Sequence, residues 1–165
     1  MQLLLNPAPA TAALMSRATA TAEALRVFIA FDDMLAYKCA LHTIEHVARQ
    51  LHEDLDLQPQ PCPFDVIESA YWRRRAADEM GDSEIVVIST SHAGSLPQTI
   101  REWLQACCHA NRDSGALLVA MLGALEDDCT SGARDTEFLR RLAEDTGWEF
   151  LTPRLGHTSP QPCSN

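Results

Sequence analysis

Two groups of polar residues follow apolar runs, and their residue types could support chemistry. The first group is the pair Asp32–Asp33, directly after VFIAF. The second is the stretch STSHAGS, residues 89–95, directly after EIVVI. Carboxylates are ligands for hard cations, and the imidazole of His92 could act as an acid or a base. A glycine lets a backbone approach a ligand closely, while serine hydroxyls and backbone amides can meet a phosphate or a ring edge.

The elements that must position these groups alternate along the chain. Short runs of β-branched and aromatic residues predict strands, and apolar residues at helical spacing predict helices between them. The predicted strands are 26–31, 64–68, 84–90, 115–122 and 148–152, and the predicted helices are 34–55, 69–80, 97–110 and 133–146.

Strands that alternate with helices predict parallel pairing through helical crossovers. Three of the five strands are almost wholly apolar, which is typical of strands covered on both faces. We therefore predict an α/β fold: a three-layer α/β/α sandwich of flavodoxin-like architecture with a five-stranded parallel sheet of order 2-1-3-4-5.

In such a sheet, ligands bind beyond the carboxyl ends of strands 1 and 3, where the strand order reverses. Both polar groups lie at those ends. The predicted ligand-binding residues are Asp32, Asp33, Ser89, Thr90, Ser91, His92, Gly94 and Ser95.

A structural interpretation of the same residues stays open beside the functional one. Asp32 or Asp33 could cap the following helix and interact favourably with its dipole. Gly-Ser-Leu-Pro is also an ordinary turn between a strand and a helix, with Ser95 as the cap and Trp103 in the core.

The amino-acid composition limits the classes of partner that we expect. The chain has 165 residues and a formal net charge of −10, from 23 acidic and 13 basic residues. This balance argues against nucleic acid and against an anionic membrane surface. No apolar run approaches the ~20 residues of a membrane span. The six cysteines include no C-x-x-C pair, and the chain is long and shows no secretory signal pattern, so we expect reduced thiols and a cytoplasmic location.

The two ends differ from the middle of the chain. Residues 1–24 are rich in Ala, Thr and Pro, and residues 154–165 have a loop-like composition. We predict a loosely ordered extension at 1–24, a domain at 25–153 and a tail at 154–165.

Three further patterns have less specific interpretations. HTIEH, residues 42–46, satisfies the H-x-x-E-H pattern of some zinc proteases. Helical spacing turns both histidines away from the apolar stripe, so no metal site is predicted.

WRRRAADE, residues 72–79, predicts the i,i+4 pairs Arg74–Asp78 and Arg75–Glu79, on a solvated face or a docking patch. Cys107 is predicted to pack inward and Cys108 to lie on the flank of its helix.

The segment SHAGSLPQTIREWL resembles the corresponding segment of flavodoxin-fold FMN reductases. The matching residues are Gly94, Ser95, Pro97, Trp103 and Leu104. This resemblance implies an FMN-dependent oxidoreductase. Such proteins hold the FMN phosphate in a loop rich in Ser, Thr and Gly after strand 1, whereas here that loop is FDDMLAYK, whose two carboxylates repel a phosphate.

The segment VFIAFDD resembles the first strand of response-regulator receiver domains, in which adjacent aspartates help to hold Mg²⁺. That resemblance implies a phosphoacceptor aspartate at the end of strand 3. This chain has Ser89 and Thr90 there, and no matching lysine after strand 5. A phosphorylatable receiver is therefore not predicted.

Over residues 26–151 the chain resembles a set of small, uncharacterised bacterial proteins. The shared motifs are FIAFDD at 28–33, PFD at 63–65 and IVVISTSHAGSLPQTIREW at 85–103. The resemblance supports the fold and implies no activity.

These observations favour a small binding or regulatory module without a phosphoacceptor, with no catalytic residues and no cofactor. The alternative is an FMN-dependent NAD(P)H oxidoreductase, with FMN as its cofactor. The expected partner is a protein or a small-molecule ligand, and a homodimer stays open.

Overall fold

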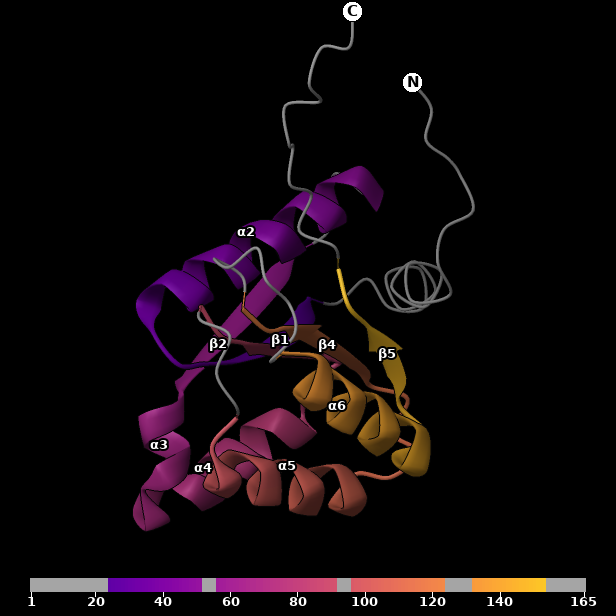
Figure 1. Ribbon diagram of the computed structural model, residues 1–165. Helices are drawn as coiled ribbons and strands as arrows, with labels where there is room; N and C mark the ends of the chain where they lie inside the picture. Colours follow the sequence, from indigo (N-terminus) through magenta and orange to yellow (C-terminus); the bar gives the residue numbers. More distant parts are fainter. Residues whose placement is uncertain (1–23, 52–55, 92–95, 124–131, 154–165) are drawn as a thin grey trace, which may run out of the picture.

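A computed structural model describes residues 24–51, 56–91, 96–123 and 132–153 of the chain (Figure 1). The predicted extension and tail lie outside these residues, apart from Ala24. The described residues form one five-stranded parallel sheet of order β2-β1-β3-β4-β5, which confirms the predicted flavodoxin-like α/β arrangement.

Apart from the second strand, the elements follow the order that the hydrophobic pattern predicts, and most of their boundaries agree within two residues. The strands are β1 (Leu25–Phe31), β2 (Leu57–Pro63), β3 (Ile85–Ser89), β4 (Leu117–Met121) and β5 (Glu149–Leu151). The helices are α2 (Met34–Leu51), α3 (Phe64–Glu68), α4 (Ala70–Gly81), α5 (Gln98–Ala110) and α6 (Gly132–Thr146).

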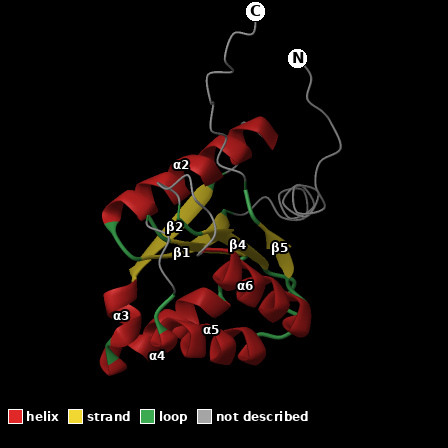
Figure 2. Cartoon of the chain, in the orientation of Figure 1, coloured by secondary structure: helices red, strands yellow, loops and turns green. Residues whose placement is uncertain are grey.

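The helices cover the two faces of the sheet unequally (Figures 1 and 2). Helix α2 lies on one face, where its apolar residues Ala40 and Ile44 pack with Ile29 and Val87. Helices α3 to α6 lie on the other face. The core on that face contains aromatic and aliphatic side chains from the sheet and from these helices, including Phe28, Ile67, Ile88, Trp103, Leu104, Leu118 and Leu139. Strands β3 and β4 are buried at every position because both of their faces are covered.

The prediction of a strand at 64–68 is wrong. Those residues form α3, in which Phe64 and Ile67, three positions apart, are both buried. The second strand is instead the proline-rich segment LQPQPCP. Its prolines occupy alternate positions, 59, 61 and 63, and β2 pairs only with β1 at the edge of the sheet. Successive N–H groups of a strand point to opposite edges, so prolines at every second residue remove donors only from the outer edge.

Candidate functional site

The predicted ligand-binding residues follow the carboxyl ends of β1 and β3. Phe31, the last residue of β1, pairs with Ser89, the last residue of β3, and Ser89 pairs with Met121 of β4. The residues that follow these strands therefore meet at one edge of the sheet. The strand order reverses here, because the chain leaves β1 toward β2 and leaves β3 toward β4.

Asp33 begins helix α2. Its Oδ1 accepts a hydrogen bond of 2.9 Å from the backbone N–H of Ala36, and its backbone carbonyl accepts from the N–H of Tyr37 at 3.2 Å. A side chain that binds the N–H group three residues ahead is an N-cap, and it satisfies a donor that has no partner within the helix. The predicted capping role is therefore confirmed, and Asp33 is the residue that fills it.

Ser91 joins the two aspartates to the end of β3. Its backbone N–H donates to the Asp32 carboxylate, at 3.1 Å from Oδ1 and 3.4 Å from Oδ2. Its hydroxyl donates to Oδ2 of Asp33. Ser91 is fully buried, Asp33 is half-buried and Asp32 is exposed. Both carboxylates thus bind Ser91, the second residue after β3.

Two hydroxyl groups at the same edge bind the fold itself. The buried Ser89 hydroxyl donates to the Ala36 carbonyl at 2.9 Å, which links β3 to the first turn of α2. The Thr90 hydroxyl accepts from the N–H of Gly123 at 2.9 Å, which links the end of β3 to the turn after β4. These side chains stabilise this edge of the sheet.

Five of the eight predicted ligand-binding residues therefore share one hydrogen-bonded edge. They are Asp32, Asp33, Ser89, Thr90 and Ser91. The other three, His92, Gly94 and Ser95, lie outside the described residues.

Asp135 is a buried charge near this edge that sequence reasoning missed. Its side chain is 1% exposed, its Oδ2 accepts from the backbone N–H of Leu96 at 2.8 Å, and its Oδ1 pairs with the Arg101 guanidinium. That guanidinium also lies over the Phe138 ring, 4.9 Å from its centroid. Asp135 thereby holds Leu96, two residues before α5, against the first turn of α6. Aspartates are common in the first turn of a helix, so the local sequence does not show that Asp135 is buried and paired rather than exposed.

Three thiols are poor candidates for chemistry. Burial raises the pKa of Cys62, Cys107 and Cys108 to about 12 in each case, with smaller contributions from Glu79, Asp78 and Cys107 respectively. These thiols stay protonated at neutral pH, and the thiolate is the reactive form. Cys108 is fully buried, so its predicted place on the flank of α5 is wrong, whereas the predicted burial of Cys107 and Trp103 is confirmed.

The histidines of the HTIEH pattern lie on the exposed side of α2, as predicted. The rings of His42 and His46 stack at 6.4 Å between centroids, and Nε2 of His46 contacts the Gln50 amide at 3.1 Å. Across the ranges that the structure describes, no group of three or more His, Cys, Asp or Glu side chains could hold a metal ion. Within the same ranges, no helix is both long enough and apolar enough to cross a membrane.

The chain matches no protein-family model, and no curated protein or solved structure shows significant similarity to it.

Proposed function

We propose that this protein is a binding module whose crevice, at the ends of β1 and β3, accepts a cationic or hydrogen-bond-donating group. The observation that carries this proposal is the convergence of the Asp32 and Asp33 carboxylates on Ser91. It favours a ligand group with a positive charge or a free hydrogen-bond donor over an anionic group such as the phosphate of FMN.

The first support is the use of the Ser91 amide. In doubly wound folds, backbone N–H groups at this edge are the donors that bind a phosphate. Here the N–H of Ser91 binds the Asp32 carboxylate, which is itself an anion. A phosphate would have to displace that carboxylate and then remain beside two negative charges, which is unfavourable.

The second support is the unused capacity of Asp32. An ionised carboxylate is an acceptor with about four lone-pair sites. The contacts of Asp32 with the Ser91 amide leave part of that capacity facing solvent, because Asp32 is exposed. An ammonium group or another donor would complement the crevice in charge and in hydrogen bonding.

Amide NMR spectra of the ¹⁵N-labelled chain, titrated separately with putrescine and with inorganic phosphate, test this proposal. We expect putrescine to shift the Ser91 and Gly123 resonances saturably, and phosphate to leave them in place. Asp32→Asn keeps an acceptor but removes the charge, so it should weaken the putrescine response severalfold. Asp56→Asn is the matched control. It removes an exposed carboxylate just before β2, at the amino ends of the parallel strands. No response to putrescine, or a saturable response to phosphate, would contradict the proposal.

A further inference from the structure

The outer face of α4 has two unlike halves. The first half carries Tyr71 and Trp72, which are 79% and 44% exposed, and the arginines that follow them. The second half carries Asp78, Gly81 and Asp82, which are small or acidic. One end of the face is thus bulky and basic, and the other end is small and acidic.

The aromatic pair is unusual in its exposure. Among the described residues, the exposed large hydrophobic side chains are Met34 and Leu35 at the start of α2, and Tyr71 and Trp72 on α4. The Tyr71 and Trp72 rings pack edge to face at 4.8 Å, and Arg75 lies over the Trp72 ring at 6.0 Å. Tyrosine, tryptophan and arginine are the residues that contribute most to binding energy at protein interfaces.

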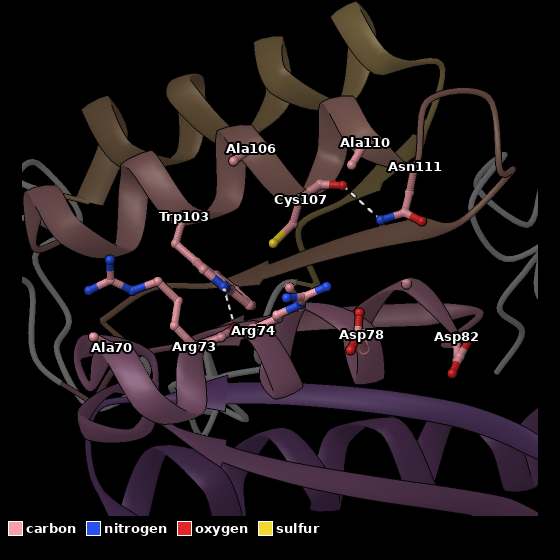
Figure 3. A pocket seen from close by; sticks show the side chains of 12 residues that line it. Ala70, Arg73, Arg74, Asp78, Asp82, Trp103, Ala106, Cys107, Ala110 and Asn111 are labelled. Atoms are coloured by element: carbon pink, nitrogen blue, oxygen red, sulfur yellow. Dashed lines mark hydrogen bonds between the residues drawn. The ribbon is translucent and has the colours of Figure 1, made fainter.

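The charges on this face are only partly paired within the chain. The predicted pair Arg75–Glu79 forms, with 3.3 Å between Nε and Oε1. The predicted pair Arg74–Asp78 does not form: among the described residues the side chains of Arg74, Asp78 and Asp82 make no salt bridge or hydrogen bond, and Figure 3 shows no contact joining Arg74 to Asp78. Arg74 and Asp78 can therefore pair with groups outside the chain.

A groove of about 680 Å³ runs beside this face, between α4 and α5 (Figure 3). Trp103 lies in the groove with its indole N–H bonded to the Arg73 carbonyl at 3.3 Å. Most other lining side chains that are uncharged are small: Ala70, Ala77, Gly81, Ala106 and Ala110. Small side chains let another helix approach closely, so a bulky side chain from a second molecule can enter here.

We propose that the α4 face is a two-fold interface between two copies of this chain, with their α4 helices antiparallel. A two-fold axis at the level of Ala76 places Arg74 opposite Asp78 of the partner subunit, and Tyr71 opposite Gly81 of the partner subunit. Every such contact occurs twice, as an isologous interface requires. The basic, aromatic half of each helix meets the acidic, small half of the other.

The charge of the α4 face is compatible with pairing between two copies of the chain. Two chains with a net charge of −10 repel each other over most of their surfaces. On α4 and its C-cap, three arginines (Arg73, Arg74 and Arg75) balance three acidic residues (Asp78, Glu79 and Asp82). Antiparallel pairing of this face brings opposite charges together without adding to that repulsion.

Sedimentation velocity of the full-length chain over a range of concentrations tests the proposal. We expect a reversible dimer with a micromolar dissociation constant. Arg74→Glu and Asp78→Arg should each raise that constant at least about tenfold, because each change places like charges together at two symmetric contacts. The double variant R74E/D78R restores both pairs with their signs exchanged and should dimerise nearly as well as the parent chain.

Arg49→Glu is the matched control, because it makes the same charge change at an exposed position on α2, across the sheet from α4 (Figure 1). It should leave the dimer unchanged. A chain that stays monomeric at all concentrations overturns the proposal and leaves the face to a partner of different sequence. Single variants that behave like Arg49→Glu, or a double variant that fails to restore the dimer, overturn it as well.

Discussion

Replacing Asp135 with Ala should lower the free energy of unfolding by about 3 kcal/mol, because it leaves two donors without their acceptor. The Asp135 carboxylate is buried and binds both the Leu96 N–H and the Arg101 guanidinium. Leu96 is buried, so its N–H cannot turn to water instead. The Arg101 side chain is 28% exposed and can regain part of its hydration. The expected loss of stability is therefore at the lower end of the range for a broken buried ion pair.

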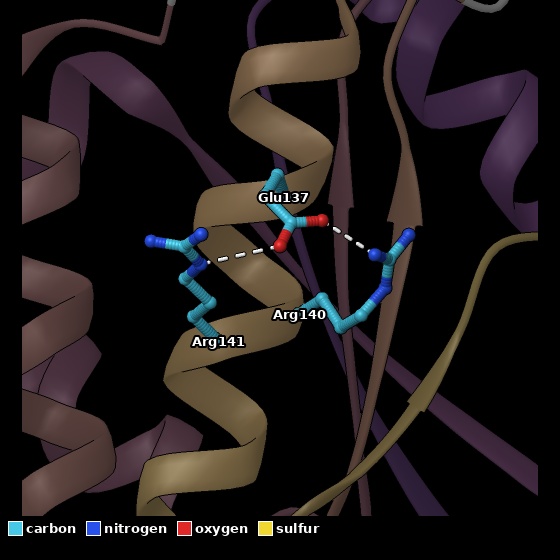
Figure 4. Close-up of polar contacts among 3 residues, drawn as sticks. All are labelled: Glu137, Arg140 and Arg141. Atoms are coloured by element: carbon cyan, nitrogen blue, oxygen red, sulfur yellow. Dashed lines mark hydrogen bonds and ion pairs between the residues drawn. The ribbon is translucent and has the colours of Figure 1, made fainter.

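Urea unfolding followed by circular dichroism measures this loss, and two variants of the same helix serve as controls. Asp135→Asn keeps an acceptor for the Leu96 N–H and should lose about half as much. Glu137→Ala breaks two ion pairs, with Arg140 and Arg141 (Figure 4). Because the Glu137 side chain is 44% exposed, that change should cost less than about 1 kcal/mol. Equal losses for Asp135→Ala and Glu137→Ala would contradict the role assigned to the buried pair.

Replacing Asp33 with Ala should lower the free energy of unfolding by about 2 kcal/mol, because the N-cap of α2 is lost together with the acceptor of the Ser91 hydroxyl. The carboxylate accepts from the Ala36 N–H at 2.9 Å, at the start of a helix of 18 residues. It also places negative charge at the positive end of the helix dipole. The same substitution should therefore loosen the contact between α2 and the end of β3.

Asp33→Ser and Asp33→Asn keep a capping oxygen and should lose less than half as much stability as Asp33→Ala in the same urea experiment. Asp32→Ala is the neighbouring control, since it removes an exposed carboxylate and leaves the cap in place. It also leaves the N–H of the buried Ser91 without this acceptor, so it should cost about 1 kcal/mol, which is less than Asp33→Ala because the exposed position of Asp32 admits water. If Ala and Ser at position 33 were equally destabilising, the cap hydrogen bond could not be the source of the effect.

The sheet could be predicted from the sequence because its central strands are continuous apolar runs. Runs such as IVVIS and LLVAM are buried at every position, and the helices between them have clear apolar spacing. The error at the second strand has a physical cause. Proline is unfavourable in most strands, so LQPQPCP reads as a connection, whereas an edge position tolerates proline at every second residue.

The meeting of the two polar groups at one edge of the sheet could be predicted from topology, but their contacts could not. Residue types place hydroxyls and carboxylates at the strand ends, but cannot show that Ser89 binds Ala36 while Ser91 binds Asp33. Those choices depend on packing between elements that are more than 50 residues apart in the chain. The Asp135 carboxylate is hidden for the same reason, since its partner Leu96 is 39 residues away.

The exposed helix pairs show a different limit. Helical spacing allows both Arg74–Asp78 and Arg75–Glu79, yet only the second pair forms. Such pairs contribute about 0.3–0.5 kcal/mol each, so spacing alone does not decide which of them is made.

We propose that the carboxylates of Asp32 and Asp33 occupy the place where the anionic end of a flavin nucleotide would have to bind. Titration of the purified chain with FMN, followed by flavin fluorescence, tests that claim most directly. We expect the fluorescence to stay equal to that of free FMN up to about 100 μM protein, a range that would reveal micromolar binding. Saturable quenching with a micromolar or tighter dissociation constant would contradict it, because the phosphate would then be bound despite Asp32 and Asp33.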